Sequence, residues 1–231
     1  MINLKRANGI LLHISSLPGS YGIGEIGPEA FTFVDDLVEM GQTLWQILPD
    51  NPTDEYHCPY SATSAFANNP MLISLDNLIR DGWLNLNDVK SYPKTNFEKV
   101  DYPRFEKFKQ DLLTKAAANF EETKKDNQKF DFENYCEKNQ YWLNDYALFC
   151  TIQNFLGEQQ WIKWPKSFRT HQISAIEDVI EEHRDKINKI KIIQYLYDVQ
   201  WKELKNYANS KGIKIIGDIP IYVSYNSVDV W

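Results

Sequence analysis

Two polar segments, each following a short apolar run, hold the residues that could do chemistry. The first spans residues 49–70 (PDNPTDEYHCPYSATSAFANNP) and follows the run TLWQIL at 43–48. The second contains Asp218, which closely follows IKII at 213–216. Barrel and open α/β enzymes place their binding and catalytic groups beyond the carboxyl ends of parallel strands. If the two apolar runs are strands of one sheet, both segments belong to one site.

The role of Asp218 is left open by its residue type and its place. Gly217 beside it permits close backbone approach. A carboxylate here could bind sugar hydroxyls, coordinate a metal, act as a general acid or base, or cap a loop. The 49–70 segment offers hydroxyls and amides, but its composition is equally typical of a surface loop.

Other kinds of chemistry have weaker support. His57 and Cys58 are adjacent but have no second pair at zinc-like spacing. Nothing in the sequence indicates an electropositive setting that would make Cys58 a nucleophile. The glycine-rich run at 19–24 has neither the Walker lysine nor the dinucleotide-binding spacing. We therefore predict no metal site and no phosphate loop.

The first elements predict a parallel sheet. Residues 9–14 (GILLHI) and 43–48 are short apolar runs bounded by turn residues, and we expect both to be buried strands. Between them, Gly27 and Pro28 are typical of a helix start, and Gly41 is typical of a helix end. This order of strand, helix and strand is a βαβ unit.

The next comparable strand, 213–216, comes only after an interval far longer than one crossover helix needs. Apolar spacing predicts four helices there: one containing Phe105 to Phe120, one containing Tyr135 to Phe155 and ending near Gly157, one starting at a capping box of Ser174 and Glu177, and one containing Ile190 to Tyr207 and ending at Gly212. We assign residues 1–75 to the first two strands and the polar loop, 76–188 to a helical insertion, and 189–231 to the return helix, the third strand and the following loop.

Composition excludes several classes of protein. The net charge of -7 argues against a nucleic-acid partner. No apolar run approaches the length of about 20 residues that a membrane span requires. Three cysteines without a disulfide pattern are typical of a reducing compartment, so we expect a cytoplasmic protein. The 7 Trp, 13 Tyr and 12 Phe residues serve either core packing or sugar stacking.

Four blocks of sequence resemble one known family. They are GILLHISSLPGSYGIGEIGPEAF at 9–31, WQILP at 45–49, CPYSATSAFANNPMLI at 58–73 and GDIPIYV at 217–223. Together they are similar to the 4-alpha-glucanotransferases, also called amylomaltases or disproportionating enzymes. The resemblance implies an α/β fold: the N-terminal part of a (β/α)8 TIM barrel, with its first three parallel strands and a large helical insertion between strands 2 and 3. It also implies retaining transfer of α-1,4-glucan segments between maltodextrins, without a metal or organic cofactor.

The resemblance assigns substrate-binding residues and no catalytic ones. Cys58, Pro59 and Tyr60 take the place of the family's Ser-Pro-Tyr segment, in which the tyrosine lines the sugar subsite next to the cleaved bond. Asp218 would contact sugar at the same subsite. The nucleophile, the acid, and the family's arginine, histidine and second aspartate are expected on later strands, downstream of Trp231.

The chain departs from the family pattern at several positions. Cys58 replaces a serine, Asp50 and Asn51 replace the Leu-Gly of LPLGPT, and Ser224, Asn226 and Val228 replace Ala, Asp and Ala. All of these positions lie in the two polar segments.

We therefore expect the N-terminal portion of a glucanotransferase that is inactive by itself. A retaining enzyme of this kind needs two carboxylates about 5 Å apart. One alternative is a noncatalytic glucan-binding or degenerate module that retains Tyr60. Another is a structural half-barrel that needs a complementing chain. The sequence leaves the oligomeric state open.

Overall fold

The computed structural model describes residues 6–90, 100–158 and 160–231. Three parallel strands form one sheet in the order β1 (Gly9–Leu11), β2 (Leu44–Gln46) and β3 (Lys214–Ile216). Gly9 pairs with Leu44, and Leu44 pairs with Lys214, so the three strands start in register. The predicted α/β arrangement with three parallel strands is confirmed.

The strands are shorter than the apolar runs that predict them. After β1 the chain turns into a 3₁₀ turn, η1 (Ile14–Ser16), and after β2 it reaches Pro49, which has no N–H to donate. Two further hydrogen bonds continue the ladder past the named strands, from Leu12 N to Gln46 O (2.9 Å) and from Ile47 N to Ile216 O (3.0 Å). Regular pairing is therefore confined to a narrow band.

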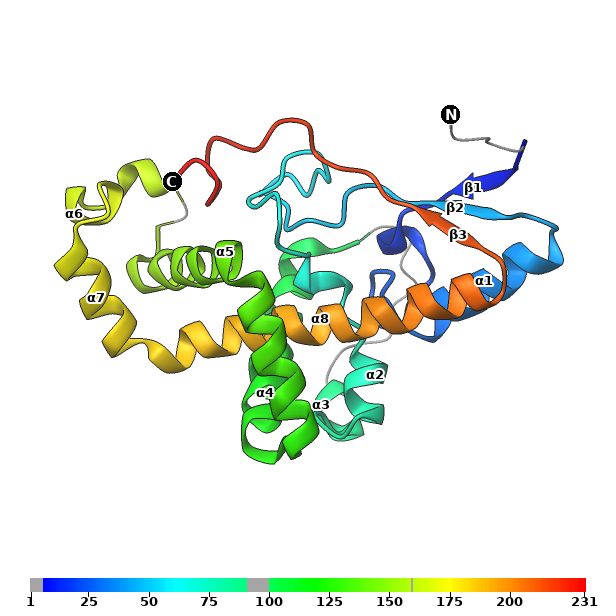
Figure 1. Ribbon diagram of the computed structural model, residues 1–231, viewed down its shortest axis with the longest axis horizontal. Helices are drawn as coiled ribbons and strands as arrows, with labels where there is room; N and C mark the ends of the chain where they lie inside the picture. The colour runs from blue at the N-terminus through cyan, green and yellow to red at the C-terminus, as the bar shows by residue number, and fades with distance from the viewer. Residues whose placement is uncertain (1–5, 91–99, 159) are drawn as a thin grey trace. The chain divides into compact units, whose positions relative to one another are not determined.

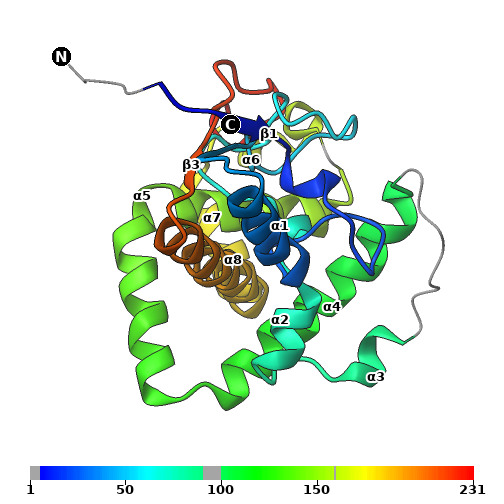
Figure 2. The same cartoon turned by 90° about the vertical axis from the view of Figure 1, so that its right-hand side faces the viewer.

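Only the central strand is well buried. Trp45 of β2 is fully buried, whereas Leu11 of β1 and Ile216 of β3 are exposed. The helix α1 (Pro28–Glu39) and the C-terminal part of α8 (Arg184–Ser210) lie on one side of the sheet (Figures 1 and 2). Phe33 of α1 packs edge-on against Trp45 at a centroid distance of 5.0 Å. In this chain the expectation of a buried strand is confirmed at Trp45 of β2, whereas β1 and β3 lie at the two edges of the sheet and are more exposed.

Helices fill the interval between β2 and β3. In the described residues they are η2 (Pro70–Leu72), α2 (Leu75–Arg80), α3 (Leu86–Val89), α4 (Tyr102–Thr123), α5 (Asp126–Leu156), η3 (Trp161–Lys163), α6 (Lys166–Arg169), α7 (Ile173–Glu182) and α8. None of the helices in these parts of the chain combines the length and the apolar character needed to cross a membrane.

The observed helix ends can be compared with the start and stop residues that the sequence predicts. Gly157 and Gly212, with φ of 62° and 83°, follow α5 and α8 in the left-handed conformation expected of them. The capping box predicted at Ser174 is wrong, because the N-cap of α7 is Gln172, two residues earlier. The Ser174 hydroxyl instead accepts a hydrogen bond from Gln172 Nε2 (3.3 Å).

The chain forms two compact units, each assembled from three segments. Unit 1 contains residues 1–50, 70–116 and 196–219, and unit 2 contains residues 51–69, 117–195 and 220–231. Unit 1 holds the sheet, α1 and α2. In unit 2, Leu148, Phe149, Ile152, Trp164 and Val179 form one hydrophobic core cluster. The sugar-site loop expected from the sequence falls in unit 2, and β3 falls in unit 1.

Candidate functional site

In unit 2 the polar loop after β2 is a small hairpin that presents Tyr60. Thr53 and Ala62 form an antiparallel bridge, and Asp54 N donates to Ser61 O (3.0 Å). The Asp54 carboxylate closes the turn by accepting hydrogen bonds from Tyr56 N (3.0 Å) and from the Ser61 hydroxyl (2.5 Å). The bridge at the base of the hairpin and the hydrogen bonds of Asp54 near its turn together fix the position of the tip.

The predicted residues Cys58, Pro59 and Tyr60 lie together at this tip. The Tyr60 side chain is 49% exposed, and Cys58 is an exposed free thiol. Ser61 N donates to Cys58 O (2.9 Å), which folds the three residues into one turn. The structure therefore brings three of the four predicted binding residues together, with an aromatic ring accessible to a ligand.

The C-terminal half of the loop is fixed by buried polar groups. The Ser64 hydroxyl accepts from the backbone N–H groups of Phe66 (3.2 Å) and Ala67 (3.0 Å). The buried Asn51 side chain donates to Ala67 O (3.0 Å) and so joins the two ends of the loop. Asn51 is one of the departures from the family pattern, and its amide has a clear structural role here.

The segment after β3 packs against the same loop within unit 2. Ser224 N donates to Ala62 O (3.2 Å), and Val228 N donates to Thr63 O (3.0 Å). The carboxylate of Asp229 accepts from Ala65 N (2.9 Å). Within unit 2, residues 224–229 of the segment after β3 are therefore in direct contact with the 51–69 loop.

The helical insertion supports that segment from another side. Trp161 N donates to the Asn226 side chain (3.1 Å), and its indole N–H donates to Tyr225 O (2.8 Å). The ring of Trp231 packs against Phe149 and Trp164 at centroid distances of 5.5 Å. Asn226, another departure from the family pattern, thus anchors the insertion to the segment after β3.

Asp218 lies in unit 1, immediately beyond β3. Its side chain is partly exposed, and one carboxylate oxygen accepts from Ile219 N (2.8 Å). This position at the carboxyl end of a parallel strand is the one expected from the sequence. Because Asp218 and Tyr60 belong to different units, their proximity stays a prediction.

Unit 1 has a second polar group at the carboxyl ends of β1 and β2. The Tyr197 hydroxyl donates to the Asp50 carboxylate (2.5 Å), and both burial and that carboxylate raise the pKa of Tyr197. Burial lowers the pKa of His13, while the negative charge of Asp50 opposes that shift. Sequence reasoning noted Asp50 only as a departure, and no local pattern indicates its partner 147 residues away.

The described residues contain no group of three or more His, Cys, Asp and Glu side chains that could hold a metal ion. The polar groups of the loop are hydroxyls, amides and carboxylates. These groups, next to an accessible aromatic ring, suit a neutral polyhydroxy ligand.

Comparison with known proteins gives a consistent result. A family model described as 4-alpha-glucanotransferase matches residues 12–231. The 4-alpha-glucanotransferase of Streptococcus pneumoniae serotype 4 is 40% identical over 98% of this chain, and that of Clostridium butyricum is 42% identical over 95%. A plant relative from Solanum tuberosum, described as chloroplastic/amyloplastic, is 39% identical over 99% of the chain.

A solved structure agrees with these relatives. The amylomaltase from Streptococcus agalactiae, described in complex with acarbose, has a TM-score of 0.90 and 38% identity and covers 98% of this chain. The match covers 46% of that structure, 45% of each of the two bacterial relatives and 40% of the plant relative. The chain thus spans a little under half the length of the proteins it matches.

Proposed function

Because this chain belongs to the 4-alpha-glucanotransferase family, we propose that it forms the N-terminal part of such an enzyme and binds an α-1,4-glucan at the 51–69 loop. The observation that carries this proposal is the hairpin tip at Cys58, Pro59 and Tyr60. There the half-exposed Tyr60 lies in a turn that is closed by a backbone hydrogen bond from Ser61 to Cys58. The acarbose in the related amylomaltase supports an oligosaccharide as the ligand class.

In this proposal Tyr60 and Asp218 have complementary roles. The flat ring of Tyr60 stacks on the apolar face of a glucose unit, and its hydroxyl offers a hydrogen bond. The carboxylate of Asp218 accepts hydrogen bonds from hydroxyls of the same glucose ring. Cys58 and Pro59 shape the turn that holds Tyr60.

The chemical step requires groups that we place outside these 231 residues. Retaining transfer uses one carboxylate as nucleophile and a second as acid and base, about 5 Å apart on either side of the bond. The family resemblance puts both on later barrel strands. The three strands present here are proposed to be the first of the eight that close a (β/α)8 barrel. The chain by itself is therefore a binding part and does not transfer glucan.

Three further expectations belong with this proposal. The proposed division into residues 1–75, 76–188 and 189–231 follows the order of the barrel strands and the helical insertion along the sequence. The two compact units are instead groups of segments that contact one another, so their boundaries differ from those of the division. The cytoplasmic location rests on the three free cysteines, although plant relatives are described as chloroplastic. Maltodextrin is the proposed substrate of the whole enzyme.

The test is a calorimetric titration of the 231-residue chain with acarbose. Tyr60→Ala should weaken binding about fivefold, because a stacked ring contributes about 1 kcal/mol. Phe130→Ala removes another exposed aromatic ring from unit 2 and should leave the affinity within twofold. If wild type binds no acarbose, or if both variants bind like wild type, the proposed function is wrong.

A further inference from the structure

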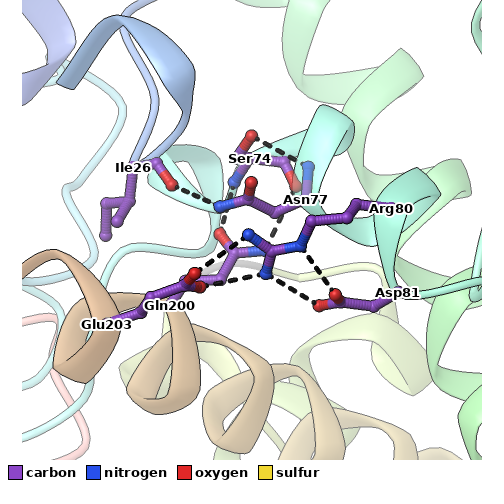
Figure 3. Close-up of polar contacts among 7 residues, drawn as sticks. All are labelled: Ile26, Ser74, Asn77, Arg80, Asp81, Gln200 and Glu203. Carbon is purple, nitrogen blue, oxygen red and sulfur yellow. Dashed lines mark hydrogen bonds and ion pairs between the residues drawn. The ribbon is translucent and has the colours of Figure 1, made fainter. Parts of the chain in front are cut away.

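Two buried glutamines on α8 hold backbone residues in the same way. The side-chain oxygen of Gln194 accepts from Asn68 N (2.9 Å), and its side-chain nitrogen donates to Asn68 O (2.9 Å). Six residues later, Gln200 accepts from Ser74 N (2.7 Å) and donates to Ser74 O (3.2 Å), as Figure 3 shows. Each glutamine side-chain amide therefore bonds to both the N–H and the C=O of one residue, as the backbone of a neighbouring β-strand would.

This two-point contact fixes orientation as well as position. A single hydrogen bond lets the peptide unit swing about it, whereas two bonds at the opposite ends of one amide do not. Gln194 and Gln200 are both buried, so a lost partner leaves a polar group without water to replace it.

The two glutamines hold different parts of the chain. Ser74, held by Gln200, is the N-cap of α2, and its hydroxyl accepts from Asn77 N (3.3 Å). Asn68, held by Gln194, closes the 51–69 loop and directly follows Ala67, whose carbonyl accepts from Asn51. Gln200 thus supports a helix start, and Gln194 supports the end of the proposed sugar loop.

The part of α8 that carries Gln194 is itself well fixed within unit 2. The next residue, Tyr195, packs against Phe120, Phe132 and Tyr135 at centroid distances of 5.5 to 5.7 Å. A side chain anchored on this cluster can transmit the position of the helix to the loop.

We propose that Gln194 is a positioning residue for glucan binding, which sets the place of the 51–69 loop by pairing with the backbone of Asn68. The inference rests on the proposed function of that loop. Gln200 supplies a matched control, because it makes the same pair of bonds on the same helix to a residue outside the loop.

Amide hydrogen exchange, measured by NMR, tests the contact without any sugar. In wild type the N–H groups of Asn68 and Ser74 should both be protected. Gln194→Met keeps a similar volume and removes both bonds, so exchange at Asn68 should rise at least about tenfold while Ser74 stays protected. Gln200→Met should give the reverse pattern.

Acarbose titration of the same proteins then tests the functional role. Gln194→Met should weaken binding about three- to tenfold, and Gln200→Met should change it less than twofold even where both lower the melting temperature equally. Should Gln194→Met fail to fold, Gln194→Asn, which keeps the amide on a shorter arm, should show a smaller change in the same direction.

The outcomes separate the two proposals. If wild type does not bind acarbose, the proposed function fails, while the exchange pattern still shows whether the contact exists. If wild type binds but the two glutamine variants weaken binding equally, or if Asn68 stays protected in Gln194→Met, the positioning role is wrong.

Discussion

At the scale of single residues, the charge pair of Glu25 and Lys109 in unit 1 links the loop before α1, the start of α2 and the helix α4. Lys109 donates to the Glu25 carboxylate and to Ile73 O, and Glu25 accepts from Leu75 N (3.0 Å). Both side chains are almost completely buried. Buried charges are costly to remove from water and are retained only with good partners. This pair therefore fixes the chain at the start of α2, next to the residue that Gln200 holds.

Removing one charge of this pair should be strongly destabilising. Above about pH 7, where the Glu25 carboxyl is ionised, Glu25→Gln leaves the Lys109 ammonium buried without a counter-charge, which should lower the free energy of unfolding by about 3–5 kcal/mol. The double variant Glu25→Gln with Lys109→Met should recover most of that loss. Urea unfolding followed by circular dichroism measures both, and equal stability of the single and double variants would contradict the role of the charge.

The same pair predicts a dependence of stability on pH. Burial raises the pKa of Glu25 from 4.5 to about 7, against the opposing effect of Lys109. Between these values the folded state binds a proton that the unfolded state has released. The contribution of Glu25 is therefore complete below about pH 4.5 and is lost as pH rises through about 7.

The measurement compares wild type with the double variant in urea at several pH values. The stability of wild type relative to the double variant should fall between pH 4.5 and 7, the interval set by the two pKa values of Glu25. A relative stability that rises over this interval would show that the Glu25 pKa is not raised in the folded protein.

At the scale of elements, the sequence predicts what depends on local patterns. The strands, α1 and the glycine ends of α5 and α8 follow from apolar runs and from residues that stop a helix. The exposure of β1 and β3 does not follow from their own apolar residues, because burial depends on the strands and helices that other parts of the chain place beside them. Gln194 and Tyr197 leave no local signal either, since their partners lie 126 and 147 residues away.

The loop between η1 and α1 gives a direct test of packing. A Cβ on Gly24 would lie 1.9 Å from Ile14 O and 2.8 Å from Leu17 N, and the backbone at both positions would have to move. Gly24→Ala should therefore destabilise by about 1–3 kcal/mol in a urea titration.

Gly217→Ala is the matched control for this substitution. Apart from Gly217 and its two chain neighbours, no described residue has an atom within 4 Å of a Cβ built at Gly217, so the stability of this variant should stay within about 0.5 kcal/mol of wild type. Equal effects of the two alanines would contradict the packing around Gly24.

At the scale of the whole molecule, binding and chemistry are separable. The segment after β3 and Gln194 both hydrogen-bond to the 51–69 loop, and neither supplies the two carboxylates of a retaining mechanism. Binding roles for Cys58, Pro59, Tyr60 and Asp218 were proposed from the family motifs and stay predictions. The contacts that support the loop could not be predicted from these motifs, because two of them are made by Asn51 and Asn226, which depart from the family pattern.

This separation predicts that the 231-residue chain does not rearrange glucans. Incubation with maltotriose, followed by chromatography of the products, should show no glucose or longer maltodextrins above a protein-free control. A S. pneumoniae 4-alpha-glucanotransferase, which the chain matches over 45% of its length, serves as the positive control. Product formation at the rate of that enzyme would show that the chain contains catalytic groups of its own.

The central proposal, which comes from the family resemblance, is that Tyr60 and Asp218 contact the same glucose ring. A crystal structure of the chain with acarbose tests it most directly. We predict one sugar ring in contact with the Tyr60 ring and hydrogen-bonded to the Asp218 carboxylate. Acarbose bound away from both residues, or the two side chains too far apart to touch one ring, would contradict the account.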